Sequence, residues 1–275
     1  MAVPELFDRA ARRARRDRAG LAGGVLDQLI AEEMFDRLDC VARTFAQPLL
    51  IGASAPMLAG LAARGLSPTV IDAAPRRAAA ANGSAGEEDA LPFAPESFDL
   101  VLAASTLDTV ADLPGALILA RRALQPDGLF LGCMVGSPSL PALRQALATA
   151  EPGARRLHPQ VDARAGGDLL ARAGFALPVA DTTMLTLSYR TFDALIADLR
   201  ASAATNVLAD RHKLSRSTVA QAQKAFADLG DGERTVETIT LLMLTGWAPD
   251  ASQPKPAKRG SATASLASTL RNRAP

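Results

Sequence analysis

Short apolar segments alternate with amphipathic stretches through the middle of the chain. The apolar segments have the length of buried strands and fall at 48–52, 69–72, 98–103 and 128–134. Helical periodicity falls at 57–64 and 114–124. Strands that alternate with helices are typical of a parallel sheet with crossover helices, so the pattern predicts an α/β fold.

Further elements are expected on both sides of this region. Helices are predicted at 5–19, 25–45, 139–151, 167–174, 191–202 and 215–229, and strands at 184–189 and 235–247. After Pro249, bulky apolar residues nearly disappear and Pro, Lys, Ser, Ala and Thr dominate. We expect an N-terminal basic helical segment (1–47), an α/β domain (48–249) with an insert (139–230), and a disordered tail (250–275).

The composition is that of an ordinary globular chain. Its 275 residues are 48% hydrophobic and carry a net charge of +1, so nucleic acid is not an expected partner. Cys40 and Cys133 lie far apart without CxxC spacing or a neighbouring histidine, which argues against a metal site and a disulfide framework. No apolar stretch reaches the length of a membrane span or a signal core, so we expect no transmembrane segment and a cytoplasmic location.

Residues 5–19 carry six arginines, interleaved with alanines and Phe7. One interpretation is a solvated charged face on a helix. The other is an arm that docks on an acidic partner protein or on a membrane surface.

The strand at 48–52 leads into the turn where α/β folds bind nucleotides. Such turns use glycines so that the backbone can approach the ligand, but here only Gly52 is present, followed by Ser54 and by Pro56, which has no N–H to donate. About 20 residues further on, Asp72 ends a strand at the spacing of a carboxylate that bonds a ribose diol. The alternative for Asp72 is a surface residue that starts a turn.

An acidic loop, Glu87-Glu88-Asp89, then precedes an apolar Leu91-Pro92-Phe93. Its carboxylates are suited to bond an adenine amino group while apolar side chains cover the ring; the alternative is a solvated loop. The candidate cofactor-binding residues are Gly52, Ser54, Asp72, Glu87, Glu88 and Ser105.

The segment from Glu87 to Gly128 closely resembles class I S-adenosylmethionine-dependent methyltransferases. The motifs that carry the resemblance are Leu91-Pro92-Phe93, Ser97-Phe98-Asp99-Leu100-Val101, Asp112-Leu113-Pro114-Gly115-Ala116-Leu117 and Leu124-Gln125-Pro126-Asp127-Gly128. The resemblance implies a Rossmann-like fold with a seven-stranded, mostly parallel sheet, N-terminal helices and a helical insert or lid over the domain at 48–249. It also implies S-adenosylmethionine as cofactor, with Asp72 and Glu87 as the ribose and adenine carboxylates.

Flanking motifs are similar to one subgroup, the arginine-hydroxylating, methyltransferase-like assembly factor of respiratory complex I and its alphaproteobacterial relatives. These motifs are Phe7-Asp8-Arg9, Arg172-Ala173-Gly174-Phe175, Asp198-Leu199-Arg200 with Asn206, and Thr245-Gly246-Trp247. The malonyl-carrier-protein methyltransferase of biotin synthesis is a more distant relative. The resemblance implies a protein partner, such as a respiratory complex subunit. The basic N-terminal helix itself is the feature that would allow peripheral membrane contact.

The chain departs from the family pattern at the turn, where Leu50, Ser54 and Pro56 replace an acidic residue and two glycines. This puts cofactor binding in doubt and leaves three functions open. The first is a methyltransferase-family protein that acts on a protein target in complex I assembly. The alternative is a non-catalytic pseudo-methyltransferase that has lost the cofactor; methylation of a small molecule or a carrier protein is a third interpretation.

The sequence identifies no catalytic residue, because methyl transfer depends on positioning more than on an acid or a base. Asp108-Thr109 replaces the family's His-Trp near the expected substrate. His158 and His212 are candidates for proton transfer or for a structural role. Arg164 is a candidate for contact with a substrate or partner, or for a surface salt bridge.

Overall fold

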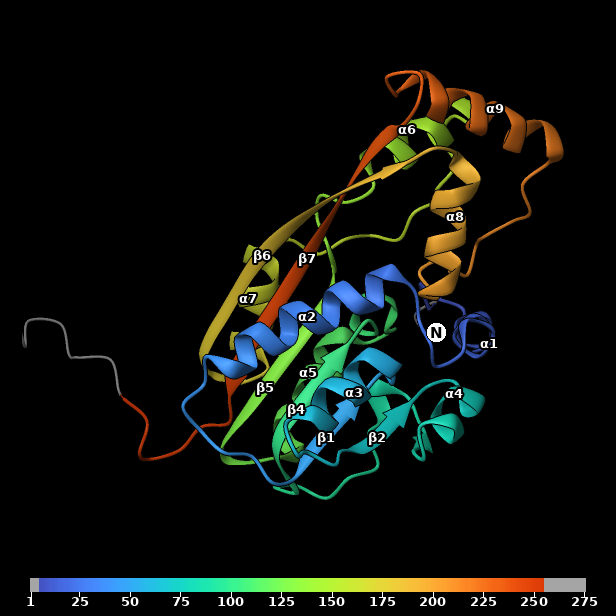
Figure 1. Ribbon diagram of the computed structural model, residues 1–275. Coiled ribbons are helices and arrows are strands. Elements are labelled where there is room, and N and C mark those ends of the chain that lie inside the picture. Colours follow the sequence, from blue (N-terminus) through green and yellow to red (C-terminus); the bar gives the residue numbers. More distant parts are fainter. Residues whose placement is uncertain (1–4, 255–275) are drawn as a thin grey trace, which may run out of the picture.

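The structure, a computed structural model, describes residues 5–254 and is built on one seven-stranded sheet (Figure 1). The strand order is β3-β2-β1-β4-β5-β7-β6, and every neighbouring pair is parallel except those of β7, which runs antiparallel to β5 and β6. The strands are β1 (Pro48–Ile51), β2 (Thr69–Asp72), β3 (Ser84–Ala85), β4 (Phe98–Ala104), β5 (Leu124–Gly136), β6 (Ala176–Tyr189) and β7 (Thr235–Trp247).

The helices are α1 (Arg9–Ala19), α2 (Val25–Asp39), α3 (Ala55–Ala63), α4 (Pro75–Ala80), α5 (Leu113–Ala123), α6 (Pro141–Ala150), α7 (Ala163–Arg172), α8 (Phe192–Ala201) and α9 (Arg216–Asp228), with short 3-10 turns η1 (Glu88–Ala90) and η2 (Leu107–Thr109). Within residues 5–254, no helix is both long enough and apolar enough to cross a bilayer.

Helices cover both faces of the sheet, because side chains alternate between the two faces of each strand. Leu50 of β1 packs with α2 and α3 on one face, while Leu49 and Ile51 pack with α5 and α7 on the other. All four residues of β1 are buried. The apolar segments are therefore central strands, as the pattern predicted.

The strands β6 and β7 form a long ribbon that runs past the rest of the sheet to α6, α8 and α9 (Figure 1). These helices continue the hydrophobic cluster that lies under α2 and α3. The insert predicted at 139–230 thus combines helices with β6.

Most predicted elements are confirmed, and the differences are local. The short elements α4 and β3 were not predicted, because Pro75-Arg76-Arg77-Ala78-Ala79-Ala80 has no apolar periodicity and β3 has only two residues. The strand predicted at 184–189 begins eight residues earlier, at Ala176, and the helix predicted at 25–45 ends at Asp39. The tail predicted at 250–275 lies outside the described residues from 255 onward.

Gly52 follows β1 in a conformation that a side chain would not tolerate. Its φ is +85°, and an added Cβ would lie 2.4 Å from the carbonyl oxygen of Ala104 at the end of β4. Its N–H donates to the carbonyl of Ile71 at 2.9 Å. Gly52 therefore lets the turn after β1 pass closely between β2 and β4.

We expect Gly52→Ala to lower the free energy of unfolding by about 2–4 kcal/mol, the sum of left-handed strain and steric overlap. Gly65→Ala is the matched control, because Gly65 has φ +71° but nothing within 4 Å of the added Cβ. Its cost should be about 1–2 kcal/mol, from the backbone strain alone. Urea denaturation measures the free energy of unfolding of both variants. An equal loss in the two would show that the contact with Ala104 is unimportant.

Candidate functional site

Four acidic side chains lie beyond the carboxyl ends of β2 and β3, at the edge of the sheet where α/β folds bind ligands. They are Asp72, Glu87, Glu88 and Asp89, and we call them the acidic cleft. Asp72 is the last residue of β2, Glu88 and Asp89 begin the 3-10 turn η1, and Glu87 directly precedes it. Asp72 and Glu88 are 1% and 2% exposed, so each needs a partner for its charge.

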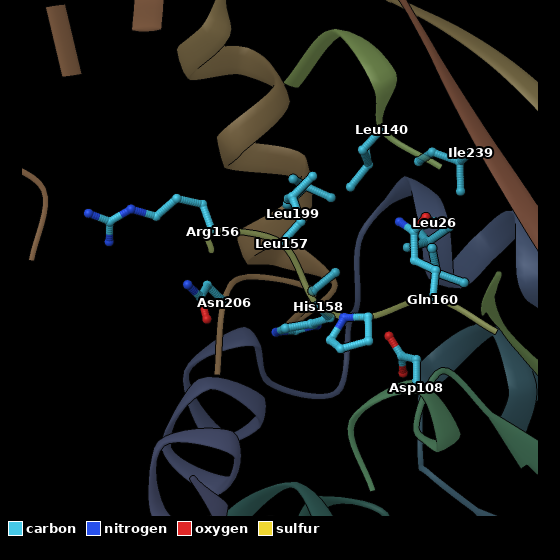
Figure 2. Close-up of a pocket in the computed structure, with 13 residues that line it drawn as sticks. Leu26, Asp108, Leu140, Arg156, Leu157, His158, Gln160, Leu199, Asn206 and Ile239 are labelled. Carbon is cyan, nitrogen blue, oxygen red and sulfur yellow. The ribbon is translucent and has the colours of Figure 1, made fainter. Parts of the chain in front are cut away.

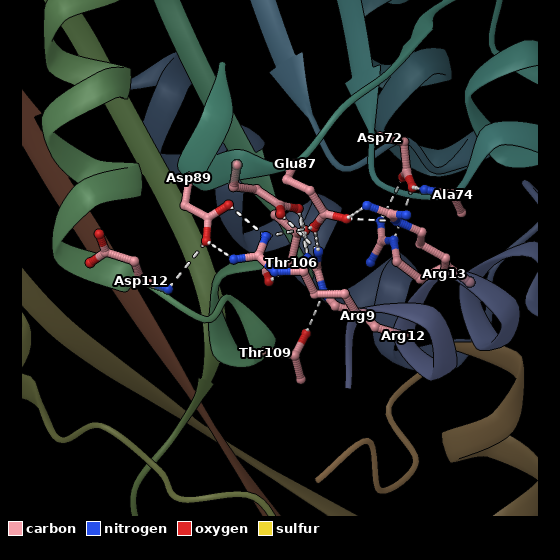
Figure 3. Close-up of polar contacts among 12 residues, drawn as sticks. Arg9, Arg12, Arg13, Asp72, Ala74, Glu87, Asp89, Thr106, Thr109 and Asp112 are labelled. Carbon is pink, nitrogen blue, oxygen red and sulfur yellow. Dashed lines mark hydrogen bonds and ion pairs between the residues drawn. The ribbon is translucent and has the colours of Figure 1, made fainter. Parts of the chain in front are cut away.

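The partners come from α1, whose inward stripe consists of arginines. The Asp8 carboxylate caps this helix by accepting a hydrogen bond from the amide of Ala11 at 2.9 Å. The spacing i, i+3, i+4, i+7, which usually carries apolar residues, is occupied by Arg9, Arg12, Arg13 and Arg16. Figure 3 shows Arg9, Arg12 and Arg13 directed from α1 toward Asp89 and Glu87.

Arg16 holds Asp72 with two parallel hydrogen bonds, from Nε at 3.0 Å and from Nη2 at 2.7 Å. Its Nη1 donates to the carbonyl of Ser105 at 2.8 Å. Asp72 also accepts hydrogen bonds from the amides of Ala53 and Ala74. Burial by itself would raise the pKa of Asp72, but the charge and hydrogen bonds of Arg16 and the Ala74 amide hold that pKa below its usual range.

Arg12 fills the middle of the acidic cleft and is only 3% exposed. Its two terminal nitrogens donate to Glu88 at 2.8 and 2.7 Å, and Nη1 also reaches Glu87 at 3.0 Å. Nη2 donates to the carbonyl and hydroxyl oxygens of Thr106, and Nε to the hydroxyl of Thr109 at 3.0 Å. Arg12 therefore joins η1 to the segment after β4.

The other two arginines of the stripe lie nearer to solvent. Arg9 forms two hydrogen bonds with Asp89, at 2.8 and 2.7 Å, and Arg13 donates to Glu87 at 2.7 Å. The hydrogen bonds from Arg9 hold the pKa of Asp89 below its usual range, despite partial burial. Every carboxylate of the acidic cleft is thus paired with α1.

Both sequence-based interpretations of the arginine run need correction. The run was expected to be a solvated face or an arm for an external partner, but Arg12 and Arg16 are buried against the chain's own carboxylates. Residues 5–19 alone could not reveal this, because the partners lie 56 and 76 positions away. The available signal was the helical spacing of the arginines together with the acidic loop.

The turn after β1 is closed from its other side by Arg77 of α4. Arg77 donates from Nε to the carbonyl of Ala53, and its Nη1 has no hydrogen-bond partner among residues 5–254. Burial lowers the pKa of Arg77, and the charge of Arg16 lowers it further. Ser54 is buried at the N-cap of α3, but its side chain makes no capping hydrogen bond.

The candidate cofactor-binding residues therefore lie around one place, but they contact α1 and one another. Gly52 and Ser54 form the turn, Ser105 binds Arg16 through its carbonyl oxygen, and Asp72 binds both the turn and Arg16. The guanidinium group of Arg12 donates hydrogen bonds to Glu87 and Glu88. In this conformation, these two carboxylates therefore bind a side chain of the protein itself. No carboxylate of the acidic cleft is free to act as a base.

Two adjoining hollows remain beside α1 and share Leu26, Asp108, Val135 and Ala204. The one next to Arg12 and Arg16 offers about 20 Å³ to the centre of a water molecule, and the other offers about 40 Å³. The second contains Asp108 and His158, while Arg156 extends away from the other side chains (Figure 2). Each hollow has room for only a few waters.

The two histidines have structural partners. His158 Nε2 accepts a hydrogen bond from the amide of Val207 at 2.9 Å, and burial lowers its pKa. His212 lies at the surface beside Glu151. Arg164 is exposed on α7, outside both hollows. Within residues 5–254, no group of three or more His, Cys, Asp or Glu side chains is arranged to hold a metal ion.

Comparisons with known proteins agree with this fold. Residues 51–132 match a family model described as a methyltransferase domain. The chain is 31% identical to the mitochondrial arginine-hydroxylase NDUFAF5 of Danio rerio, over 95% of this chain and 88% of that protein. It is 30% identical to the malonyl-[acyl-carrier protein] O-methyltransferase of Laribacter hongkongensis, over 90% and 89% of the two chains.

Four further proteins named arginine-hydroxylase NDUFAF5 match over only 40–56% of their own length. Among solved structures, the YcgJ protein of Bacillus subtilis aligns with a TM-score of 0.56 at 16% identity, covering 81% of this chain and 99% of that one. This last likeness concerns the fold alone.

The methyltransferase-domain match supports the cofactor expected from the sequence, S-adenosylmethionine. In the conformation described, α1 occupies the carboxylates expected to bind it. All four hydrogen bonds that Asp72 accepts come from the protein, and Arg12 lies between Glu87 and Glu88. The hollow beside these arginines is lined by Arg12 and Arg16 and by none of the four carboxylates. The acidic cleft is closed by α1.

We expect Arg16→Met to raise the pKa of Asp72 and to flatten the acid side of the stability profile. In the wild type that pKa is depressed by folding, so its contribution is present above the unfolded value of about 3.9 and is lost as pH falls. Urea denaturation between about pH 5 and pH 2 should therefore give a shallower slope for Arg16→Met. Arg18→Met, an exposed change in the same helix, should keep the wild-type slope; a wild-type slope in both variants would contradict the pairing.

Proposed function

The chain belongs to the S-adenosylmethionine-dependent methyltransferase family, and we propose that it acts on a protein target in the assembly of respiratory complex I. The observation that carries this proposal is the likeness to an arginine-hydroxylase NDUFAF5 over 95% of the chain. The sequence motifs resemble the complex I assembly factor across the same span. The proposal includes the cytoplasmic location expected from the sequence.

The hollow around Asp108 and His158 is narrow, at about 40 Å³, but a neighbouring hollow that shares Arg156 and His158 with it has about 300 Å³. The larger volume lies at the lower end of the range of small-molecule pockets, roughly 300–1,000 Å³. The choice of a protein target therefore rests on the relatives and not on the size of the hollows. The likeness to a carrier-protein methyltransferase is compatible with a protein target as well.

A second candidate function is that of a non-catalytic assembly factor. The observation that favours it is the complete engagement of Asp72 and the acidic loop by α1, beside a turn in which Ser54 and Pro56 replace glycines. In this version the chain keeps the family's fold and binds its partner without cofactor. The two candidates differ in whether S-adenosylmethionine is bound during function.

We expect deletion of the gene to lower the amount of assembled complex I while the other respiratory complexes are retained. Native gel electrophoresis of membranes and NADH–quinone oxidoreductase activity measure this, and the full chain supplied in trans should restore both. Unchanged complex I in the deletion strain would contradict a role in its assembly, whatever the cofactor does.

Calorimetric titration with S-adenosylmethionine and S-adenosylhomocysteine separates the two candidates. We expect the wild type to bind both ligands, with an affinity that is lowered because α1 holds Asp72 and the acidic loop. The variant Ser54→Gly/Pro56→Gly, which restores two glycines of the turn, is the control for the contribution of the turn. Micromolar binding by the wild type would favour the methyltransferase candidate over the non-catalytic one.

A further inference from the structure

Helix α1 is docked by charge and contributes almost no apolar surface to the core. Its buried residues are Arg12 and Arg16, and none of its residues belongs to the two large hydrophobic clusters. An apolar face resists undocking because its exposure to water costs roughly 25 cal/mol per Å². A face of arginines regains hydration when it leaves, which offsets much of the lost ion pairing.

The chain on either side of α1 would allow such a movement. Before α1, the amide of Asp8 donates to the carbonyl of Val207 at 2.8 Å, and Phe7 packs with Val207 and Leu208. After α1, residues 20–24 contain three glycines, and Gly20 and Gly23 have φ of +69° and +72°. Within this segment, the carbonyl of Leu21 accepts a hydrogen bond from the amide of Ala55 at 2.7 Å. Gly20, which lies between α1 and that contact, can therefore act as a hinge while the contacts of Phe7, Asp8 and Leu21 keep α1 nearby.

We propose that α1 is a displaceable latch on the acidic cleft, and that its arginines and an adenosine-containing cofactor compete for the same carboxylates. A carboxylate can accept paired hydrogen bonds from a guanidinium or from a ribose diol, but the same lone pairs cannot serve both. Asp72 already accepts two bonds from Arg16 and two from backbone amides. Glu87 and Glu88 likewise accept hydrogen bonds from Arg12.

The competition gives the chain two states. In the latched state, four ion-paired arginines close the cleft and seal the turn around Gly52. In the open state, α1 is hydrated, and Asp72 and the acidic loop face solvent. A ligand that binds only the open state shifts the equilibrium by its affinity for that state.

The first experiment compares two pairs of substitutions in α1, both placed in the Ser54→Gly/Pro56→Gly background so that the turn does not limit binding. Arg12→Gln/Arg16→Gln removes the buried pair of arginines. Arg15→Gln/Arg18→Gln makes the same change of charge outside the cleft, where Arg15 contacts Thr205 and Arg18 is exposed. S-adenosylhomocysteine is titrated calorimetrically into each variant and into the parent.

We expect Arg12→Gln/Arg16→Gln to bind S-adenosylhomocysteine at least about tenfold more tightly than the parent, since the competitor for the site is removed. Arg15→Gln/Arg18→Gln should bind like the parent. Equal affinities in the two variants, or no binding by any of them, would overturn the proposal that α1 is what excludes the cofactor.

Hydrogen–deuterium exchange of the wild-type chain tests the latch without any substitution. Amides of residues 9–19 should exchange at least about tenfold faster at about 1 M NaCl than at about 0.05 M, because salt weakens docking by charge. Amides of α2, which docks through Ile30, Met34 and other apolar residues, should be nearly unaffected and report that the fold is intact. Salt-independent protection of α1 equal to that of α2 would show that α1 is a fixed part of the fold.

Discussion

The ion pair between Arg16 and Asp72 fixes the end of the sheet where the candidate site lies. One guanidinium bonds the carboxylate that ends β2 and the carbonyl that follows β4, and the same carboxylate holds the amide of the turn after β1. Three neighbouring strands and α1 therefore meet at a single contact. Because Asp72 and Arg16 are almost fully buried while α1 is docked, removal of one would leave the other as an uncompensated buried charge.

This contact explains why the N-terminal helix can be both buried and hydrophilic. A helix usually docks through an apolar stripe, but the surface that α1 meets is made of carboxylates, so the complementary stripe is basic. The match extends over four arginines and four acids, from Asp72 to Asp89. Such docking is specific, since each guanidinium meets a carboxylate in a fixed geometry, and the helix itself contributes almost no apolar surface to it.

Sequence patterns could predict the sheet because each central strand is a short apolar run with its own signal. They could predict that Gly52, Asp72 and the acidic loop lie together, since strand ends of one sheet share an edge. They could not predict that arginines of α1 would bind the carboxylates there. Arginines at helical spacing are equally compatible with a solvated face, and the ion pairs of Arg12 and Arg16 depend on tertiary contacts between distant segments. The unpredicted α4 likewise owes its place partly to Arg77, which binds the turn.

The presence of Asp72 is therefore ambiguous as a sign of cofactor binding. A carboxylate at the end of the second strand is what a ribose diol requires, but here it is also what the buried Arg16 requires. Two features favour the pairing of Asp72 with Arg16 over the binding of a ribose. In the turn, Pro56 has no amide N–H to donate and Ser54 replaces a glycine. The arginines of α1 compete with a ribose for the same carboxylate. A fold inherited with its cofactor site can therefore retain the acidic residues of that site for a different partner, and function has to be argued from what those residues contact.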